Sequence, residues 1–246
     1  MTEINIVIPT FNEEDNIERL IKSIQKKLPN CYILIVDDSK NNNIELILKK
    51  KNIKKKVRYI NRKNSKGRGS AVLFGFKKSL KKNKDQIFIE MDADFSHKPS
   101  EINKNIKLFK KRKSDLLIAS RYRSKSKIFN WSLSRRIFSR LSNILTKFIL
   151  RIGVTDYTNG FRIYSKKAIK LITKNCGNIG DGFIVLSEIL LILHLNKFKI
   201  DETETIFINR KRGESSVNLN LIIQSLFGLI RLFFIKRNYK YNKKKI

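Results

Sequence analysis

The sequence has few acidic residues, few cysteines and no long apolar segment, and each shortage excludes a class of protein. Only 21 Asp and Glu residues stand against 54 Lys and Arg residues, which gives a net charge of +33. The two cysteines, Cys31 and Cys176, lack the spacing of a metal site, so we expect reduced thiols in a cytoplasmic setting. There is no apolar run of about 18 residues, and the chain enters a strand-like segment at once. We therefore expect neither a transmembrane helix nor a signal peptide.

The charge excess predicts an anionic partner, such as nucleic acid, an acidic membrane or a phosphorylated substrate. A general bias of the sequence toward Lys, Asn and Ile also explains part of this charge. No nucleic-acid-binding module is recognisable, and acidic residues line the cleft predicted below, so we expect no nucleic-acid partner. With 246 residues and 41% hydrophobic residues, the chain is long and apolar enough for one sizeable folded domain.

Strand-like and helix-like segments alternate from the first residues to about residue 120. Short apolar runs at 4–8, 31–36, 57–60, 87–91 and 115–119 predict strands, and helical periodicity follows several of them, with Asn12 as the N-cap of the first helix. This alternation predicts an α/β fold with a mostly parallel sheet and helices on both faces. Polar clusters at 9–13, 37–38, 92–94 and 120–123 would then meet at the carboxyl ends of the strands, where such sheets bind ligands.

Asp92 and Asp94 end the apolar run 87–91, with one alanine between them. Two carboxylates at the end of a buried strand repel each other unless a cation or a polar cleft accommodates them. Oxygen ligands of this kind suit Mg²⁺ or Mn²⁺ that also contacts substrate phosphates. The alternative interpretation is a solvated turn, because Asp is common in turns.

A basic turn, Lys66-Gly67-Arg68-Gly69, precedes another predicted helix. It lacks the P-loop pattern, but a helix N-terminus with Lys66 beside it could approach a nucleotide or phosphate. The alternative is an ordinary loop between two elements of secondary structure, with no role in binding.

Two basic amphipathic helices are predicted in the second half of the chain, at 134–151 and 218–236, and a lysine-rich tail follows the second. Apolar residues recur at helical spacing in both, which is typical of helices that lie on an anionic membrane surface. Alternatively, the first helix packs on the sheet, and the second docks on the domain or on a second subunit.

Several short motifs together resemble the family-2 glycosyltransferases, in particular the polyprenyl-phosphate glycosyltransferases such as the dolichol-phosphate mannosyltransferases. The resemblance runs from residue 4 to about residue 216. Its carriers are the segments 6–13, 36–39, 66–69, 91–99, 120–122 and 156–162, with Arg210 and the segment 213–215.

The resemblance implies a GT-A fold and a set of site residues. The nucleoside-binding edge would contain Pro9, Phe11, Glu13, Val36 and Asp38, and Lys66 and Arg210 would also bind the donor. Asp92 and Ala93 would lie by the ribose and diphosphate, and Asp92, Asp94 and Ser96 would hold Mg²⁺ or Mn²⁺. Asp94 and two arginines, Arg121 and Arg135, would be catalytic, the arginines meeting the donor diphosphate and the acceptor phosphate.

The implied reaction is metal-dependent, inverting transfer of a sugar, mannose from GDP-mannose in the first instance, to a polyprenyl phosphate of dolichyl type. A UDP-sugar donor, or a soluble saccharide or protein acceptor, is the alternative. We expect a GT-A domain at 1–216 and a membrane-associated segment at 217–246, placed peripherally on the cytoplasmic face of a membrane. The chain departs from the family at Ser216, where a lysine is usual, and Lys211 or Arg212 could replace it. It also lacks the C-terminal membrane helices of some relatives, which leaves room for a membrane-protein partner.

Overall fold

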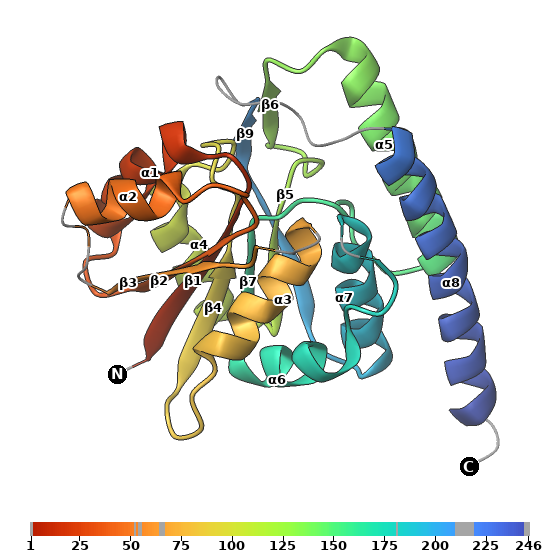
Figure 1. Ribbon diagram of the computed structural model, residues 1–246. Helices are drawn as coiled ribbons and strands as arrows, with labels where there is room; N and C mark the ends of the chain where they lie inside the picture. The colour runs from red at the N-terminus through yellow and green to blue at the C-terminus, as the bar shows by residue number, and fades with distance from the viewer. Residues whose placement is uncertain are drawn as a thin grey trace.

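A seven-stranded, mostly parallel sheet forms the centre of the computed structural model, which describes residues 2–51, 53, 56–63, 67–180, 182–209 and 219–243 (Figure 1). The strand order is β3-β2-β1-β4-β7-β5-β8, and only β7 runs antiparallel to its neighbours. The strands are β1 (Glu3–Thr10), β2 (Tyr32–Asp37), β3 (Val57–Asn61), β4 (Gln86–Glu90), β5 (Leu116–Ser120), β7 (Arg162–Ser165) and β8 (Ile200–Glu204). Two short strands, β6 (Lys127–Phe129) and β9 (Ile206–Ile208), pair in parallel beside the sheet.

Helices cover both faces of the sheet, as the alternating sequence pattern predicts. The helices are α1 (Glu14–Lys27), α2 (Asn43–Lys50), α3 (Arg68–Ser79), α4 (Ile102–Arg112), α5 (Leu133–Leu150), α6 (Lys166–Asn175), α7 (Ile184–Leu195) and α8 (Leu219–Lys243), with a 3₁₀ turn at Pro99–Glu101. One face packs against α1, α2 and α4, and the other packs against α3, α6 and α7. The α/β class and the layered arrangement are therefore confirmed.

The period-two alternation of strand side chains separates the two halves of the core. In β1, Ile6 and Ile8 point into the layer with α1, whereas Val7 points into the layer with α3. All three are fully buried. Because the centre of β1 is buried on both faces, it is formed by the consecutive apolar residues 6–8, with the buried Asn5 just before them.

Helices α5 and α8 lie side by side outside α7 and extend beyond the sheet (Figure 1). Leu229 and Leu232 of α8 are buried in this contact, and Lys236 Nζ donates a hydrogen bond to the carbonyl oxygen of Ile149 at 3.0 Å. Among the helices that the structure describes, none is both long and apolar enough to cross a bilayer.

Two local expectations are wrong. Asn12 does not cap α1, because Glu13 occupies the N-cap position. Asn12 lies at φ 54°, and its backbone N–H donates to Ser39 Oγ in the loop after β2 at 2.8 Å. The helix predicted at 218–236 continues to Lys243, so part of the expected tail is helical.

Candidate functional site

The polar segments predicted to meet at one edge of the sheet do meet there. The strands β1, β2, β4 and β5 end at Thr10, Asp37, Glu90 and Ser120, and β1, β2 and β4 are parallel neighbours. Thr10 Oγ1 donates to Asp37 Oδ1 at 2.9 Å, which ties two of these strand ends together. The edge therefore brings the predicted nucleoside-binding and metal-binding segments to one side of the molecule.

The two aspartates after β2 have different environments. Asp37 is fully buried and accepts hydrogen bonds from Ser39 Oγ and Tyr59 Oη, so it braces the loop from inside. Asp38 is partly exposed and accepts two hydrogen bonds from the guanidinium of Arg62, both at 2.8 Å. Beside this pair Phe11 is 58% exposed, so an aromatic face and a fixed ion pair are presented at the edge where the nucleoside is expected.

The loop after β4 folds back so that its polar groups point inward. Phe95 lies at φ 60°, and the Ser96 backbone N–H donates to Asp94 Oδ1 at 3.0 Å. Asp94 and Ser96 are both buried, and within the described residues the Ser96 hydroxyl has no hydrogen-bond partner. An unsatisfied buried hydroxyl beside a carboxylate leaves an oxygen available to a ligand.

A partly buried arginine lies against the first aspartate of the same loop. Arg68, the first residue of α3, places its Nε 2.7 Å from Asp92 Oδ1, and its Nη2 donates to the carbonyl oxygen of Gly160 at 3.3 Å. On the other side, His97 Nε2 lies 3.3 Å from Asp92 Oδ2. Burial raises the pKa of Asp92, but the charges and hydrogen bonds of Arg68 and His97 more than offset this and hold the pKa well below its usual range. Asp92 is therefore ionised and fixed in orientation.

Arg121, directly after β5, forms a second buried ion pair. Its Nε and Nη2 each lie 2.8 Å from an oxygen of Asp156, and its backbone N–H also donates to that carboxylate at 2.9 Å. Burial raises the pKa of Asp156, but the charge of Arg121 outweighs it and lowers the pKa below its ordinary value. This bidentate geometry fixes the plane of the guanidinium, and none of these bonds uses Nη1.

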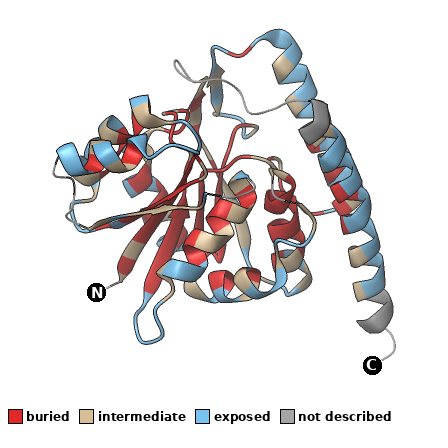
Figure 2. Cartoon of the chain, viewed as in Figure 1, coloured by how far each residue is buried: buried red, intermediate tan, exposed pale blue. Residues whose placement is uncertain are grey.

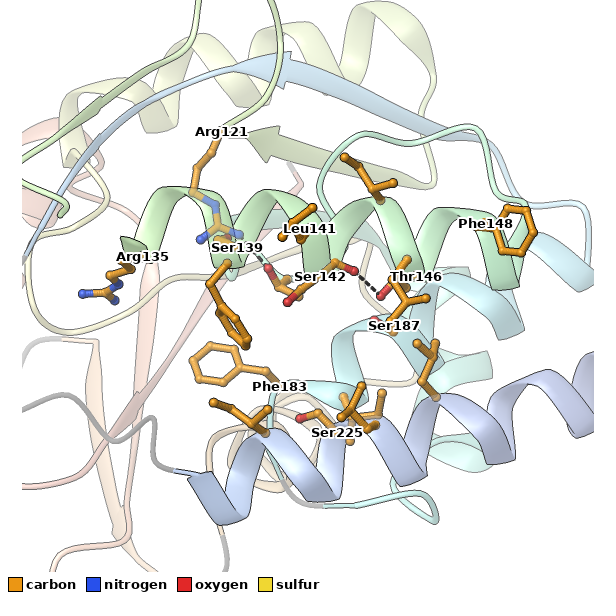
Figure 3. Close-up of a pocket in the computed structure, with 18 of the residues that line it drawn as sticks. Arg121, Arg135, Ser139, Leu141, Ser142, Thr146, Phe148, Phe183, Ser187 and Ser225 are labelled. Carbon is orange, nitrogen blue, oxygen red and sulfur yellow. Dashed lines mark hydrogen bonds between the residues drawn. The ribbon is translucent and has the colours of Figure 1, made fainter. Parts of the chain in front are cut away.

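A groove leads away from Arg121 between α5, α7 and α8, with a volume of about 1000 Å³. Figure 3 shows Arg121 and Arg135 toward one end and Phe148 toward the other, with α5 and α8 on opposite sides. The lining between these ends is mostly apolar and includes Phe138, Leu141, Ile144, Leu145, Phe183, Ile184, Leu226 and Leu229. An apolar groove that begins at two arginines suits a molecule with an anionic head and a hydrocarbon chain.

The structure brings most of the predicted site residues to this edge. It describes Pro9, Phe11, Glu13, Val36, Asp38, Asp92, Ala93, Asp94, Ser96, Arg121 and Arg135. Pro9 and Val36 pair within the sheet, so they form the floor of the edge, and both are buried. Lys66 and Arg210 lie outside the described residues, as do Lys211, Arg212 and Ser216.

Several residues of the site were not predicted. The sequence motifs assign no role to Asp156, to the pairing of Arg68 with Asp92, or to Trp131, whose ring centroid lies 4.6 Å from the guanidinium carbon of Arg135. The groove was also missed, because it arises only when two distant helices pack together. The presence of only one tryptophan in the sequence could have marked Trp131 as a candidate site residue. Its separation from Arg121 along the sequence, however, does not predict that the two side chains are in contact.

Comparison with known proteins identifies the family. The model of glycosyl transferase family 2 matches residues 5–173. Polyprenol monophosphomannose synthase from Mycolicibacterium smegmatis is 28% identical over 227 residues, covering 90% of this chain and 83% of that protein. Dolichol-phosphate mannosyltransferase from Pyrococcus furiosus is 32% identical over 235 residues, covering 94% of this chain; the chain spans 63% of that relative's length.

Solved structures with the same fold are similar over nearly the whole chain. Glucosyl-3-phosphoglycerate synthase from Mycobacterium tuberculosis, in complex with Mn²⁺, UDP and phosphoglyceric acid, matches with a TM-score of 0.67 at 16% identity, covering 94% of this chain and 78% of that one. A complex of the same enzyme with Mn²⁺, UDP-glucose and phosphoglyceric acid gives 0.66 at 17% identity, covering 94% and 80%. These likenesses confirm the predicted GT-A type of fold. The family match covers more than half of the residues, and the chain belongs to glycosyl transferase family 2.

Proposed function

We propose that this glycosyltransferase moves mannose from GDP-mannose to a polyprenyl phosphate of dolichyl type. The observation that carries the proposal is the apolar groove that begins at Arg121 and Arg135. A phosphate at the arginine end and an isoprenoid chain between α5 and α8 would match the charge and the apolar lining of the groove. The names of the mycobacterial and archaeal relatives support the same acceptor and sugar.

The donor would bind across the strand ends, with its nucleoside by Pro9, Phe11, Glu13, Val36 and Asp38. Phe11 offers an exposed ring for stacking on the base, and the Asp38 carboxylate is held in place by Arg62. Asp92 and Ala93 would lie by the ribose and diphosphate. Lys66 and Arg210 are proposed as further donor-binding residues from the sequence alone.

A divalent cation, Mg²⁺ or Mn²⁺, fits the loop after β4. The buried hydroxyl of Ser96, which is unpartnered among the described residues, lies on the same turn as the Asp94 carboxylate, and both are oxygen ligands of the kind these ions prefer. Within the described part of the chain, no group of three or more His, Cys, Asp or Glu residues could hold a metal by itself, so the donor diphosphate would complete the site. Asp94 and Ser96 would hold the ion, with Asp92 alongside, and the bound ion would act as a Lewis acid toward the leaving diphosphate.

The remaining chemistry needs charge stabilisation and no general base. A lipid phosphate is already an anion at neutral pH and can attack the anomeric carbon as it stands. Arg135 and Arg121 would hold that phosphate against its repulsion from the donor diphosphate, and the Asp156 pair keeps the Arg121 plane fixed. Attack from the side opposite the leaving group would invert the configuration at the sugar.

The chain would dock peripherally on a membrane through α5 and α8. In the described chain, all the large exposed hydrophobic side chains except Phe11, Tyr32, Leu46 and Phe129 lie on these two helices. Their outward faces appear pale blue in Figure 2. Neither helix contains an Asp or Glu, and both carry exposed arginines such as Arg136, Arg140 and Arg231. Exposed apolar side chains on helices whose only charged residues are cations suit an interface with anionic lipids.

We place this membrane contact on the cytoplasmic side, in line with two unpaired cysteines in a chain that has no disulfide among its described residues. Residues 217–246 would form a membrane-associated segment that follows the GT-A domain. A membrane protein that packs against α8 is a further partner that this surface could accept.

A transfer assay tests the function directly. Purified chain would be mixed with Mn²⁺ or Mg²⁺, a short polyprenyl phosphate, and labelled GDP-mannose, UDP-glucose or UDP-N-acetylglucosamine in parallel reactions. We expect label in the organic phase from GDP-mannose alone. Lipid-phase label from a UDP-sugar would correct the donor, whereas nucleotide release without any lipid-phase label would point to a soluble acceptor and overturn the proposal.

A further inference from the structure

One indole ring lies beside both arginines at the head of the groove. The guanidinium carbon of Arg135 is 4.6 Å from the ring centroid of Trp131, and that of Arg121 is 5.3 Å from it. Trp131 is only 8% exposed, so this contact is shielded from water, where cation–π attraction is stronger. Two like charges drawn to one ring are thereby held near each other at the mouth of an apolar cavity.

Each arginine is also fixed from a second direction. Asp156 holds Arg121, and Asn209 Oδ1 accepts a hydrogen bond from Arg135 Nη1 at 2.9 Å. The indole itself is not held by hydrogen bonding, because its buried Nε1 has no partner among the described residues. Its position is set by packing on Phe207, whose ring centroid lies 5.2 Å away at 67°.

The same aromatic packing continues to the donor side. Phe207 contacts the ring of His97 at 5.4 Å, and His97 Nε2 lies 3.3 Å from Asp92 Oδ2. The backbone N–H of Ile208 donates to the Ser96 carbonyl oxygen at 3.2 Å, so β9 is bonded to the loop that carries Asp94. A continuous row, Trp131–Phe207–His97, therefore spans the space between the acceptor arginines and Asp92.

We propose that Trp131 is a positioning residue that holds Arg121 and Arg135 as one two-armed site for the acceptor phosphate. This inference depends on the proposed polyprenyl-phosphate acceptor. The side chain does not react; it acts through the two guanidinium groups and sets their distance from the donor loop through Phe207.

Binding can be read from the protein's own fluorescence, because Trp131 is the only tryptophan in the chain. The full chain would be titrated with farnesyl phosphate and, in parallel, with farnesol at the same concentrations. We expect a saturable change in emission with the phosphate, and a midpoint raised about ten-fold in Arg135→Gln. The absence of a saturable change with the phosphate, or an equal change with farnesol, would overturn the inference.

Kinetics separate positioning from simple structural support. In Trp131→Leu we expect the KM for the lipid phosphate to rise about ten-fold, with the KM for the donor within about two-fold of the parent. Trp131→Phe should retain most of the affinity, since it keeps an aromatic face. Phe129→Leu, on the neighbouring exposed strand β6, is the matched control and should leave both KM values unchanged.

A double variant decides whether Trp131 acts through the arginine. If it does, adding Trp131→Leu to Arg135→Gln should raise the acceptor KM by clearly less than the roughly ten-fold that Trp131→Leu causes alone, because only Arg121 is left to be positioned. Independent, multiplicative effects would contradict the proposal. Failure of the parent protein to transfer sugar to any lipid phosphate would instead remove the proposed function, which the parent assay reveals separately.

Discussion

Arg68 and Asp92 form a partly buried ion pair at the centre of the site, with 2.7 Å between Nε and Oδ1. The side chain of Arg68 is 13% exposed, and its Nη2 also lies 3.7 Å from the fully buried Glu90. One guanidinium thus serves two carboxylates at the end of β4. Without it, two like charges would remain in a region from which water is largely excluded.

Replacing Arg68 by leucine should therefore destabilise the fold. We expect the free energy of unfolding to fall by about 3 kcal/mol, because Asp92 and Glu90 lose their shared counter-charge. Urea denaturation at neutral pH measures this. Lys77→Leu, at an exposed position on the same helix, is the control and should change it by less than about 0.5 kcal/mol. A similar small change in Arg68→Leu would show that the pair is not needed.

Gly160 should tolerate no side chain while Arg68 is present. A Cβ at this position would overlap Arg68 Nη2, which forces the guanidinium away from Asp92. We expect Gly160→Ala to lower the unfolding free energy by about 2 kcal/mol, and Gly153→Ala, whose Cβ would meet no atom within 4 Å, to leave it nearly unchanged. In an Arg68→Leu background the Gly160→Ala change should be nearly neutral, so additive effects in a denaturation cycle would contradict this explanation.

The sequence predicted the framework of this site well, because strand alternation and the order of short motifs carry that information. Asp92, Asp94 and Arg121 were placed at strand ends from local pattern alone. Strand β7 was missed because its four residues, Arg162–Ser165, include a buried arginine and show no clear alternation. Arg162 is fully buried because its guanidinium donates to three backbone carbonyls, a solution that no local pattern reveals.

Contacts across the sequence could not be predicted in the same way. Arg68 and Gly160 are 92 residues apart, and Arg121 and Asp156 are 35 apart. Their pairing depends on how α3 and the loop before β7 approach the same sheet edge. The amphipathic pattern of α5 and α8 was visible in the sequence, but the groove between them requires the packing of both helices beside α7.

Asp94 should be required for metal-supported turnover. We expect Asp94→Asn to lower kcat at least about 100-fold. The loss of a negatively charged oxygen ligand should weaken binding of the divalent ion, and that ion would neutralise the departing diphosphate. Electron paramagnetic resonance of Mn²⁺ in the presence of GDP should show weaker binding in the same variant. Asp85→Asn, at an exposed position before β4, is the control. Normal Mn²⁺ affinity in Asp94→Asn would remove this residue from the metal site.

Acid should destabilise the protein partly through Asp156. Because its folded pKa lies below the unfolded value of about 3.9, the stabilisation from this carboxylate is complete above that pH and is lost as the pH falls through the folded pKa. Asp156→Asn should be less stable at pH 7 by about 3 kcal/mol, since Arg121 stays buried without its counter-charge. Its stability should then depend less on pH below about 4 than that of the parent or of the exposed control Asp15→Asn. Parallel pH profiles of the two variants would contradict the assignment.

Membrane docking should depend on the outward face of α8. Phe227 and Phe234 are 62% and 52% exposed, so replacing both by aspartate should leave the fold intact while placing acids where an anionic membrane would lie. In flotation with liposomes that contain anionic lipid, we expect the parent to float and the double variant to remain at the bottom. Leu46→Asp, at a 61% exposed position on α2, is the control that shows whether an acid placed at any exposed apolar position has the same effect. Raising the salt concentration should weaken but not abolish flotation of the parent, because the arginines and lysines contribute through screened attraction while the phenylalanines contribute through burial. If the double variant floats like the parent, α8 does not face the lipid, and its exposed side chains are then available to another protein.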